Sequence, residues 1–439
     1  MPRELTPLLV VLAGLAGCPS SVTRDADAEA EVEQPDGGDA LDVDAWDGTD
    51  SPLDDGDSSE AEADMAEEAD GWDFGADLWD PERNCDAAAE DPPAWIAPPC
   101  GDGCRQVAFA AQPRGPFAAS ERWLAYRSRY RTWVVELEST DESVLFCHPY
   151  FVGSYGLDVD GDVVGFAIGT DFMVGEIHVD YASIWTTDLR ARRWRPLHEW
   201  TKPHPAEMTG IAAARLGARH FVFSLYDFVQ DGPSSWTQRG NMYVADIDTR
   251  ELWRLMDTDR PCCFGWPDIG GDWVVYSTTD AVLAYNLERG TTIGPDIPGD
   301  QYWPRTDGVK VIWLDHRNYP GGYMSGGSWD IYSYDFETET ELRITTESTP
   351  VYEDAAPDML GDVVVWSDRR NATLEEPHHR DLFLYRYSTG RQQQLTFASG
   401  AARWPRVTRD AVYFLWSPDP EPDPDTADRA ICEQRLPPP

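Results

Sequence analysis

One short stretch of the chain concentrates side chains that could perform acid–base chemistry. Residues 356–371 read APDMLGDVVVWSDRRN, in which five charged residues surround a run of four apolar ones: Asp358, Asp362, Asp368, Arg369 and Arg370. Carboxylates this close to guanidiniums suit a catalytic cluster. The same residue types also favour turns, so the stretch has a structural interpretation as well.

The stretch is repeated along the chain, which favours the structural interpretation. WPRTDGVKVIWLDHRN begins at Trp303 and WPDIGGDWVVYS at Trp266, with proline, glycine and an aromatic residue in register. Weaker copies begin at Gly156, Ala213 and Trp404, and a degenerate one at Glu121. A second unit follows each copy and is clearest as DIYSYDFETETELRIT from Asp330 and DLFLYRYSTGRQQQLT from Asp381. Its alternation of apolar and polar residues predicts a strand, a polar turn and another strand.

Seven such pairs predict an all-β fold, a single β-propeller with seven four-stranded blades. The copies recur at roughly 36 to 56 residues, which is typical of propeller blades with variable loops. Six blades are the alternative, because the first copy is degenerate. The strand CRQVAFA, from Cys104, precedes the first blade, and we expect it to pair beside the strand at 429–436 and close the ring. Closure of this kind removes an exposed sheet edge.

The N-terminus, residues 1–17, has the features of a signal peptide. Its apolar core at residues 8–16 is too short to span a bilayer as a mature helix. The sequence Leu15-Ala16-Gly17-Cys18 resembles the lipobox of bacterial lipoproteins, which implies that Cys18 is lipidated and becomes the mature N-terminus. Because Pro19 follows the cysteine in place of aspartate, the resemblance favours the outer membrane, facing the periplasm or the cell surface. An ordinary signal with an incidental cysteine and a buried apolar segment are the alternatives.

Residues 18–99 predict a disordered acidic tether behind the lipidated cysteine. Residues 25–90 contain 26 acidic residues and a single arginine, Arg83. Like-charge repulsion and the near absence of apolar periodicity predict disorder. The whole chain carries a formal net charge of −44, so we expect no binding to nucleic acid and membrane contact through the lipid anchor only.

The two repeated units together resemble the TolB-like β-propeller repeats. Their pattern is (W/A)PD-x-x-G-D-x-V-V-(W/Y) followed by D-(I/L)-(Y/F)-x-Y-D-x-x-T-G-x-x-x-x-L-T, and the resemblance covers residues 104–436 of a propeller domain at 100–439. It implies a periplasmic, secreted or lipid-anchored binding protein. Such propellers also occur in prolyl-oligopeptidase-type peptidases, where a separate hydrolase domain does the chemistry. This chain has no G-x-S-x-G motif and no helical α/β segment for such a domain.

One position in the first unit alternates in charge along the chain. The third residue of each of the other six copies should lie on the innermost strand. In chain order these residues are Asp158, Arg215, Asp268, Arg305, Asp358 and Arg406, and the degenerate first blade has Ala118 at this position. One interpretation is a self-compensating channel lining, in which each guanidinium has two carboxylate neighbours. The other is a binding pocket for a charged peptide end or a small ligand, open at Ala118.

The connections after the second strands form a second candidate binding region. They are long at 170–182, 226–240, 319–329 and 372–380, and we expect them to gather on one face with residues suited to recognition. The candidate binding residues are Trp236, Tyr319, Tyr323, Trp329 and Arg380. Trp266, Trp303 and Trp404 belong to the same face or wedge between blades.

The cysteines and histidines indicate disulfides but no metal. Disulfides form outside the cytoplasm, and a bridge from Cys100 or Cys104 to Cys432 would lock the closing strand. The eight histidines, including the adjacent pair His378-His379, have no metal-ligand spacing. We therefore expect no metal and no cofactor.

These patterns predict a monomeric, lipid-anchored, non-catalytic propeller that binds an envelope protein, a peptide or a glycan. A propeller-type polysaccharide lyase or other hydrolytic enzyme is one alternative, and it requires acid–base or metal-binding side chains at the channel mouth. A purely structural envelope component with a flat, charged face is another.

Overall fold

The computed structural model describes the part of the chain that forms the repeats. The described residues are 104–110, 117–128, 131–147, 153–174, 177–203, 207–232, 235–255, 265–278, 281–294, 301–318, 329–345, 356–376, 378–397, 399–418 and 429–438. All of them belong to one compact unit. The predicted signal peptide and acidic tether lie outside these residues. No helix in the described ranges has the length and apolar character needed to cross a membrane.

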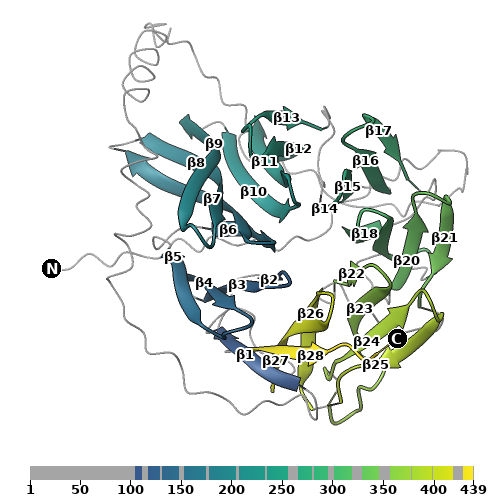
Figure 1. Ribbon diagram of the computed structural model, residues 1–439. Coiled ribbons are helices and arrows are strands. Elements are labelled where there is room, and N and C mark those ends of the chain that lie inside the picture. Colours follow the sequence, from purple (N-terminus) through teal and green to yellow (C-terminus); the bar gives the residue numbers. More distant parts are fainter. Residues whose placement is uncertain are drawn as a thin grey trace, which may run out of the picture. The chain divides into compact units, whose positions relative to one another are not determined.

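Seven four-stranded antiparallel sheets, formed by the described residues, surround a central axis (Figure 1). Blade 1 contains β2 (Ala118–Ala119), β3 (Trp123–Ser128), β4 (Arg131–Glu136) and β5 (Glu142–Cys147). Blade 2 contains β6 (Gly153–Asp160), β7 (Val163–Val174), β8 (Ile177–Asp188) and β9 (Arg193–Pro203). Blade 3 contains β10 (Glu207–Leu216), β11 (His220–Gly232), β12 (Ser235–Asp246) and β13 (Leu252–Arg254). The prediction of a seven-bladed propeller is confirmed, and the alternative of six blades is wrong.

The remaining blades continue in chain order. Blade 4 contains β14 (Gly265–Gly270), β15 (Trp273–Ser277), β16 (Val282–Asn286) and β17 (Thr291–Ile293). Blade 5 contains β18 (Gln301–Thr306), β19 (Lys310–Asp315), β20 (Asp330–Asp335) and β21 (Thr340–Arg343). Blade 6 contains β22 (Asp358–Leu360), β23 (Val363–Asp368), β24 (Asp381–Arg386) and β25 (Arg391–Gln394). Blade 7 contains β26 (Ala401–Val407), β27 (Ala411–Ser417), β28 (Arg429–Arg435) and β1 (Cys104–Ala110).

The ring closes through strands from both ends of the repeat region. β1 pairs antiparallel with β28 and completes blade 7, as the sequence predicted. The first strands of neighbouring blades contact one another all the way round, including β26 against β2. These first strands therefore form the inner wall of the propeller. β1 lies at the other side of blade 7 and covers the outer edge of β28, an edge that would otherwise be exposed.

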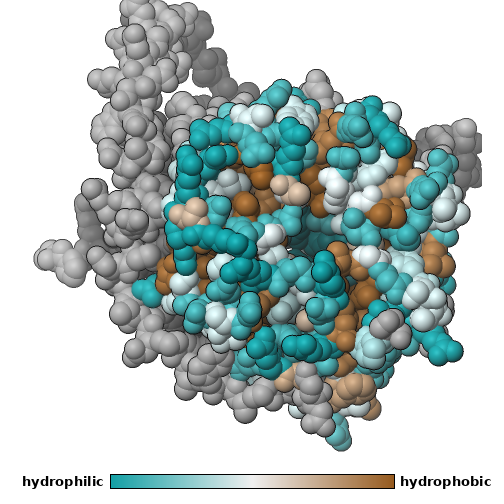
Figure 2. All heavy atoms as spheres, in the orientation of Figure 1, coloured by the Kyte–Doolittle hydropathy of each residue, from teal (hydrophilic) through white to brown (hydrophobic). Residues whose placement is uncertain are grey.

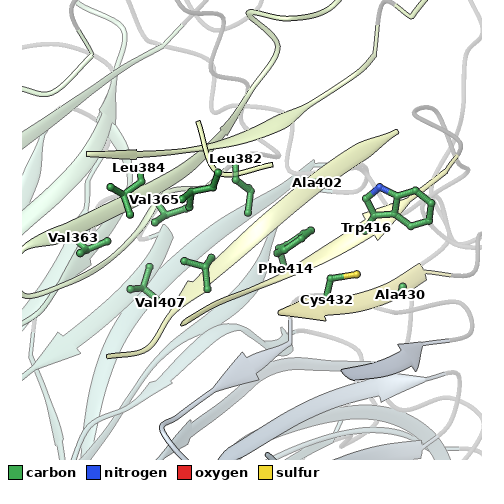
Figure 3. Close-up of a cluster of buried hydrophobic side chains, with 12 residues drawn as sticks. Val363, Val365, Leu382, Leu384, Ala402, Val407, Phe414, Trp416, Ala430 and Cys432 are labelled. Carbon is green, nitrogen blue, oxygen red and sulfur yellow. The ribbon is translucent and has the colours of Figure 1, made fainter. Parts of the chain in front are cut away.

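Apolar residues that alternate along the strands pack the blades against one another. Figure 3 shows one such cluster, in which Val363, Val365 and Leu382 of blade 6 face Val407 and Phe414 of blade 7. All of these side chains are buried. Burying an aliphatic or aromatic side chain of this size contributes about 1.5–3 kcal/mol. Contacts between blades therefore hold the channel wall in place.

Two connections that the sequence predicted as loops are strands. In blade 2, β7 and β8 pair continuously to Val174 and Ile177, so most of 170–182 is an extended hairpin. In blade 3, β11 and β12 pair as far as Gln230 and Trp236, so 226–240 is a hairpin too. The physical reason is that β-branched and aromatic residues continue in both segments beyond the first polar residues, which supports pairing.

Candidate functional site

The six alternating charges, called the channel ring below, all lie on first strands. β6, β10, β14, β18, β22 and β26 each contribute one residue, in the order Asp158, Arg215, Asp268, Arg305, Asp358 and Arg406. Figure 2 shows a hollow at the centre of the blades with hydrophilic residues inside it. The repeat register thus brings together residues that are up to 248 positions apart in the sequence.

The three aspartates of the channel ring tie neighbouring blades together. Each one accepts a hydrogen bond from the next blade. The donor is the backbone N–H of the residue directly after the channel-ring arginine. The bonds are Leu216 N to Asp158 Oδ2 at 2.9 Å, Thr306 N to Asp268 Oδ2 at 2.8 Å and Val407 N to Asp358 Oδ2 at 2.7 Å. One oxygen of each carboxylate is therefore committed to the fold.

The distances from the channel-ring arginines to the carboxylates are longer than the hydrogen bonds that the aspartates accept from the backbone. Arg215 Nε lies 3.5 Å from Asp268 Oδ1, and Arg305 Nε lies 3.8 Å from Asp358 Oδ1. Arg406 faces blade 1, which has no charged residue at this position, and donates from Nε to Phe117 O at 3.2 Å. The channel ring is thus partly self-compensating, and its ion pairs are longer than close charge-assisted hydrogen bonds.

Burial and crowding of like charges shift the pKa values of Asp268, Arg305 and Arg406 in the channel ring. Burial raises the pKa of Asp268 to about 6, although Arg305 and Arg215 oppose the shift. Burial, followed by repulsion from Arg215, lowers the pKa of Arg305 to about 9. Burial and Arg215 also lower the pKa of Arg406. The positive charge of Arg215 therefore disfavours the charged forms of Arg305 and Arg406.

Tryptophans mark one end of the channel. Trp266, Trp303 and Trp404 have φ angles of 55°, 57° and 51°, a conformation in which a bulky side chain is an outlier. Each lies at a β-bulge in a first strand, two residues before a member of the channel ring. The rings of Trp266 and Trp303 stack with centroids 4.1 Å apart. Three repeated outliers of this kind cost free energy and indicate a constrained local geometry.

This end of the propeller, called the Trp face below, is where first strands begin and second strands end. In blade 4, for example, Gly265 pairs with Ser277. Two fully described apolar side chains protrude there from blade 6: Leu374, between β23 and β24, is 101% exposed, and Phe397, after β25, is 73% exposed. On the opposite face Val309 and Leu360 are only 50% and 40% exposed. Leu374 and Phe397 were not among the residues predicted from the sequence, because neither belongs to a repeated motif.

The five binding residues predicted on the loops differ in position and burial. Tyr319 and Tyr323 lie outside the described residues, and Trp236 lies in β12, where only its backbone is described. Trp329 and Arg380 are 4% and 2% exposed, so the expectation that they present a recognition surface is wrong. Trp329 instead packs edge-to-face on Tyr302 at 5.4 Å between ring centroids. Aromatic burial between blades 5 and 6 outweighs its exposure on a loop.

Charged residues of the 356–371 stretch form a buried structural network. Asp368 is 1% exposed and accepts hydrogen bonds from Trp366 Nε1 at 3.2 Å, Arg370 N at 2.6 Å and Arg370 Nε at 2.7 Å. The guanidinium of Arg370 lies 3.8 Å from the ring centre of Phe383. Asp315 makes equivalent bonds in blade 5. These carboxylates are engaged in supporting the strand ends.

A histidine–aspartate pair belongs to the same kind of network. His379 Nε2 lies 3.0 Å from Asp381 Oδ2, and Asp381 also accepts from Asn371 Nδ2 at 2.7 Å and Gln394 Nε2 at 3.0 Å. Within the described ranges, no group of three or more His, Cys, Asp and Glu side chains is arranged to hold a metal ion.

A surface pocket of about 460 Å³ opens between blades 5 and 6. Its lining includes Arg343, Arg370, Tyr385 and Gln392. Both arginines are engaged by buried carboxylates, Arg343 Nη2 with Asp330 at 2.9 Å and Arg370 with Asp368. Both arginines of the pocket are therefore committed to supporting the fold.

The expected disulfide from Cys104 to Cys432 is not formed. Cys432 is a free, buried thiol, and Cys104 is disulfide-bonded to a different cysteine. The strand register explains this, because Gln106 lies opposite Cys432 and Cys104 lies opposite Gln434. The thiol of Cys432 points into the core between blades 6 and 7 (Figure 3). Burial raises its pKa to about 12, which makes it unreactive at neutral pH. Cys100 lies outside the described residues.

Comparisons with known proteins identify similar structures but no family. No protein-family model and no curated protein sequence matches the chain. An oligogalacturonate lyase in complex with manganese is 12% identical at a TM-score of 0.48, over 72% of this chain and 85% of that one. An acylaminoacyl peptidase from Pyrococcus horikoshii is 13% identical at a TM-score of 0.46, over 70% of this chain and 49% of that one. This chain thus spans about half the length of that peptidase.

TolB from Acinetobacter baumannii is also similar. It is 12% identical at a TM-score of 0.33, over 75% of this chain and 79% of that one. Similarities of this size assign no activity to the chain, and its class as a seven-bladed β-propeller rests on its own strand order. Fold alone does not fix function, so function must be argued from the site.

Proposed function

We propose that the protein is a lipid-anchored β-propeller of the cell envelope that binds a protein or peptide partner on its Trp face without catalysing a reaction. Cys18 supplies the anchor, and the acidic segment behind it holds the propeller away from the outer membrane. Partner binding at a propeller face requires a rigid ring, which the closed inner wall of first strands provides.

The observation that carries the proposal is the gathering of apolar groups on one face. Leu374 and Phe397 are 101% and 73% exposed, and the stacked, half-buried pair Trp266–Trp303 lies at the same end of the propeller. Tryptophan and arginine are the residues most enriched among energetically dominant interface contacts. At the Trp face, tryptophans and buried arginines lie within two residues of each other along β18 and β26.

The state of the acidic residues supports binding without chemistry. Catalysis by paired carboxylates needs groups that can exchange protons with a substrate. Asp368 and Asp315 instead accept several hydrogen bonds from their own strand ends. Each aspartate of the channel ring holds a backbone N–H of the next blade.

The proposal is tested by capturing partners from envelope extracts with the full-length chain. Leu374→Asp/Phe397→Asp places charges on the Trp face at exposed positions, where the fold should tolerate them. We expect at least a ~10-fold loss of captured partner, which corresponds to removal of one interface anchor. Val309→Asp/Leu360→Asp makes the same change on the opposite face and should leave capture unchanged.

Two results would contradict the proposal. Equal recovery of partners by wild type and by the Trp-face variant would show that binding lies elsewhere. Recovery of a polysaccharide that the wild-type chain then shortens would favour the enzyme that the sequence left as an alternative.

A further inference from the structure

Three guanidiniums converge on the channel from alternate blades. Arg215, Arg305 and Arg406 come from blades 3, 5 and 7 and are 6%, 2% and 8% exposed. Each donates from Nη1 to the carbonyl of the preceding residue, to Ala214 O at 3.2 Å, Pro304 O at 2.9 Å and Pro405 O at 3.0 Å. The same contact in three blades shows that the repeat fixes these side chains in one shared arrangement.

Arg305 has hydrogen-bond donors that the described residues leave unused. Its Nε and Nη2 are buried and make no hydrogen bond within the described part of the chain. Asp358 Oδ1 is 3.8 Å from Nε, which is too long for a hydrogen bond. A buried, charged donor without an acceptor is costly, and native proteins rarely keep one without a reason.

The neighbouring aspartates accept no hydrogen bond from these two donors. Asp268 and Asp358 flank Arg305, but each already accepts the backbone N–H of the following blade. Repulsion from Arg215 contributes to the lowered pKa values of Arg305 and Arg406. An additional anion in the channel would reduce this repulsion and would accept hydrogen bonds from the unused donors of Arg305.

We propose that Arg215, Arg305 and Arg406 form a receptor for a carboxylate group that enters the channel from the Trp face. The inference rests on the proposed function, because it names the chemical group by which a partner engages the channel. Guanidiniums bind carboxylates through two parallel hydrogen bonds. Three aspartates line the same ring, so a singly charged carboxylate is favoured over a dianion such as phosphate.

The test measures binding of small probes to the full-length chain at constant ionic strength. N-acetylglycine presents a peptide-like terminal carboxylate, and N-acetylglycinamide is its neutral counterpart. We expect N-acetylglycine to raise the melting temperature saturably, N-acetylglycinamide to have no effect, and inorganic phosphate to bind more weakly. A titration with acetate distinguishes a free small carboxylate ligand from the C-terminal carboxylate of a polypeptide. If acetate raises the melting temperature as much as N-acetylglycine does, the ligand is a free small carboxylate. If acetate raises it less, the ligand is a chain terminus.

Variants identify the residues that bind the probe. Arg305→Gln should weaken N-acetylglycine binding at least 10-fold, whereas Arg289→Gln, in the exposed turn between β16 and β17, should not change it. Asp358→Asn removes a competing carboxylate and should tighten binding several-fold. Tightening cannot result from misfolding, so this variant keeps the test valid if Arg305→Gln is unstable.

The inference is overturned if N-acetylglycinamide shifts the melting temperature as much as N-acetylglycine does, or if neither shifts it. It is also overturned if Asp358→Asn weakens binding in a folded protein. Leu374→Asp/Phe397→Asp should retain the carboxylate site and lose the partner. If that variant loses the partner while no carboxylate binds to wild type, this inference fails and the proposed function stands.

Discussion

Asp368 illustrates how a charged side chain serves the fold. Its buried carboxylate accepts hydrogen bonds from Trp366 and Arg370. Removing it leaves an indole N–H and a guanidinium without their acceptor. We therefore expect Asp368→Ala to lower the free energy of unfolding by about 3–5 kcal/mol, measured by urea denaturation.

Asp362 provides the matched control in the same stretch. Its carboxylate accepts from Ser388 N and Oγ, both at 2.6 Å, in an exposed turn. Because water can replace these bonds, Asp362→Ala should cost about 1 kcal/mol. Equal losses for Asp362→Ala and Asp368→Ala would contradict the distinction between turn and buried network.

Asp268 should make stability depend on pH. Burial raises its pKa to about 6, from about 3.9 in an unfolded chain. The folded state holds the proton more tightly, so this contribution is complete below the unfolded pKa and is lost as the pH rises through about 6. Between about pH 4 and pH 6 the free energy of unfolding of wild type should fall relative to that of Asp268→Asn.

Denaturant unfolding of both proteins across this window measures the effect. The difference between two curves removes the titration of the other carboxylates, provided that they behave alike in both proteins. A difference that stays constant with pH, or that moves in favour of wild type as the pH rises, would contradict the raised pKa.

At the scale of elements, β1 is the strand whose role is easiest to isolate. It buries Val107 and Ala108 and covers the outer edge of β28. A chain that begins at residue 111 lacks β1, whereas one that begins at residue 81 keeps it. Loss of one buried valine alone is worth about 1.5–3 kcal/mol, so the shorter chain should melt several degrees lower.

The exposed edge should also change its association. An unpaired strand edge is a template for intermolecular pairing, so we expect the chain without β1 to form oligomers detectable by light scattering. Identical melting temperatures and monodisperse behaviour for the two truncations would show that β1 does not close the ring.

Repetition explains which elements could be predicted from the sequence. Seven copies of a strand pair define blades even when single copies are weak. The last copy lacks its fourth strand, so the unassigned strand at Cys104 could be predicted to complete that blade. The hairpins of blades 2 and 3 were missed because their extra residues match nothing in the other copies. Pairing of these extra residues depends on contacts between neighbouring strands, and the similarity between repeats does not reveal such contacts.

The channel ring and the Trp face differ in the same way. The position of Asp158 and its five counterparts within the repeated sequence unit was enough to predict that they lie on first strands. The positive φ angles of Trp266 and Trp303 and their stacking depend on a bulge and on the neighbouring blade. Burial of Trp329 and exposure of Leu374 likewise follow from packing between blades, so their roles were not visible in the sequence.

For the whole molecule, Cys18 is the residue on which the proposed location depends. Two acyl chains give stable membrane attachment, whereas a soluble acidic protein without them is repelled by anionic lipid. Cys18→Ser should therefore move most of the protein from the membrane fraction to the soluble fraction, as seen by immunoblotting after fractionation. Unchanged membrane association would contradict the anchor.

The central claim is that a partner is bound on the Trp face, and photo-crosslinking in intact cells tests it most directly. A photoreactive amino acid replaces Leu374 on the Trp face in one protein and Leu360 on the opposite face in another. We predict a discrete cross-linked adduct from position 374 and none from position 360. An adduct from position 360 alone, or from neither position, would contradict the account.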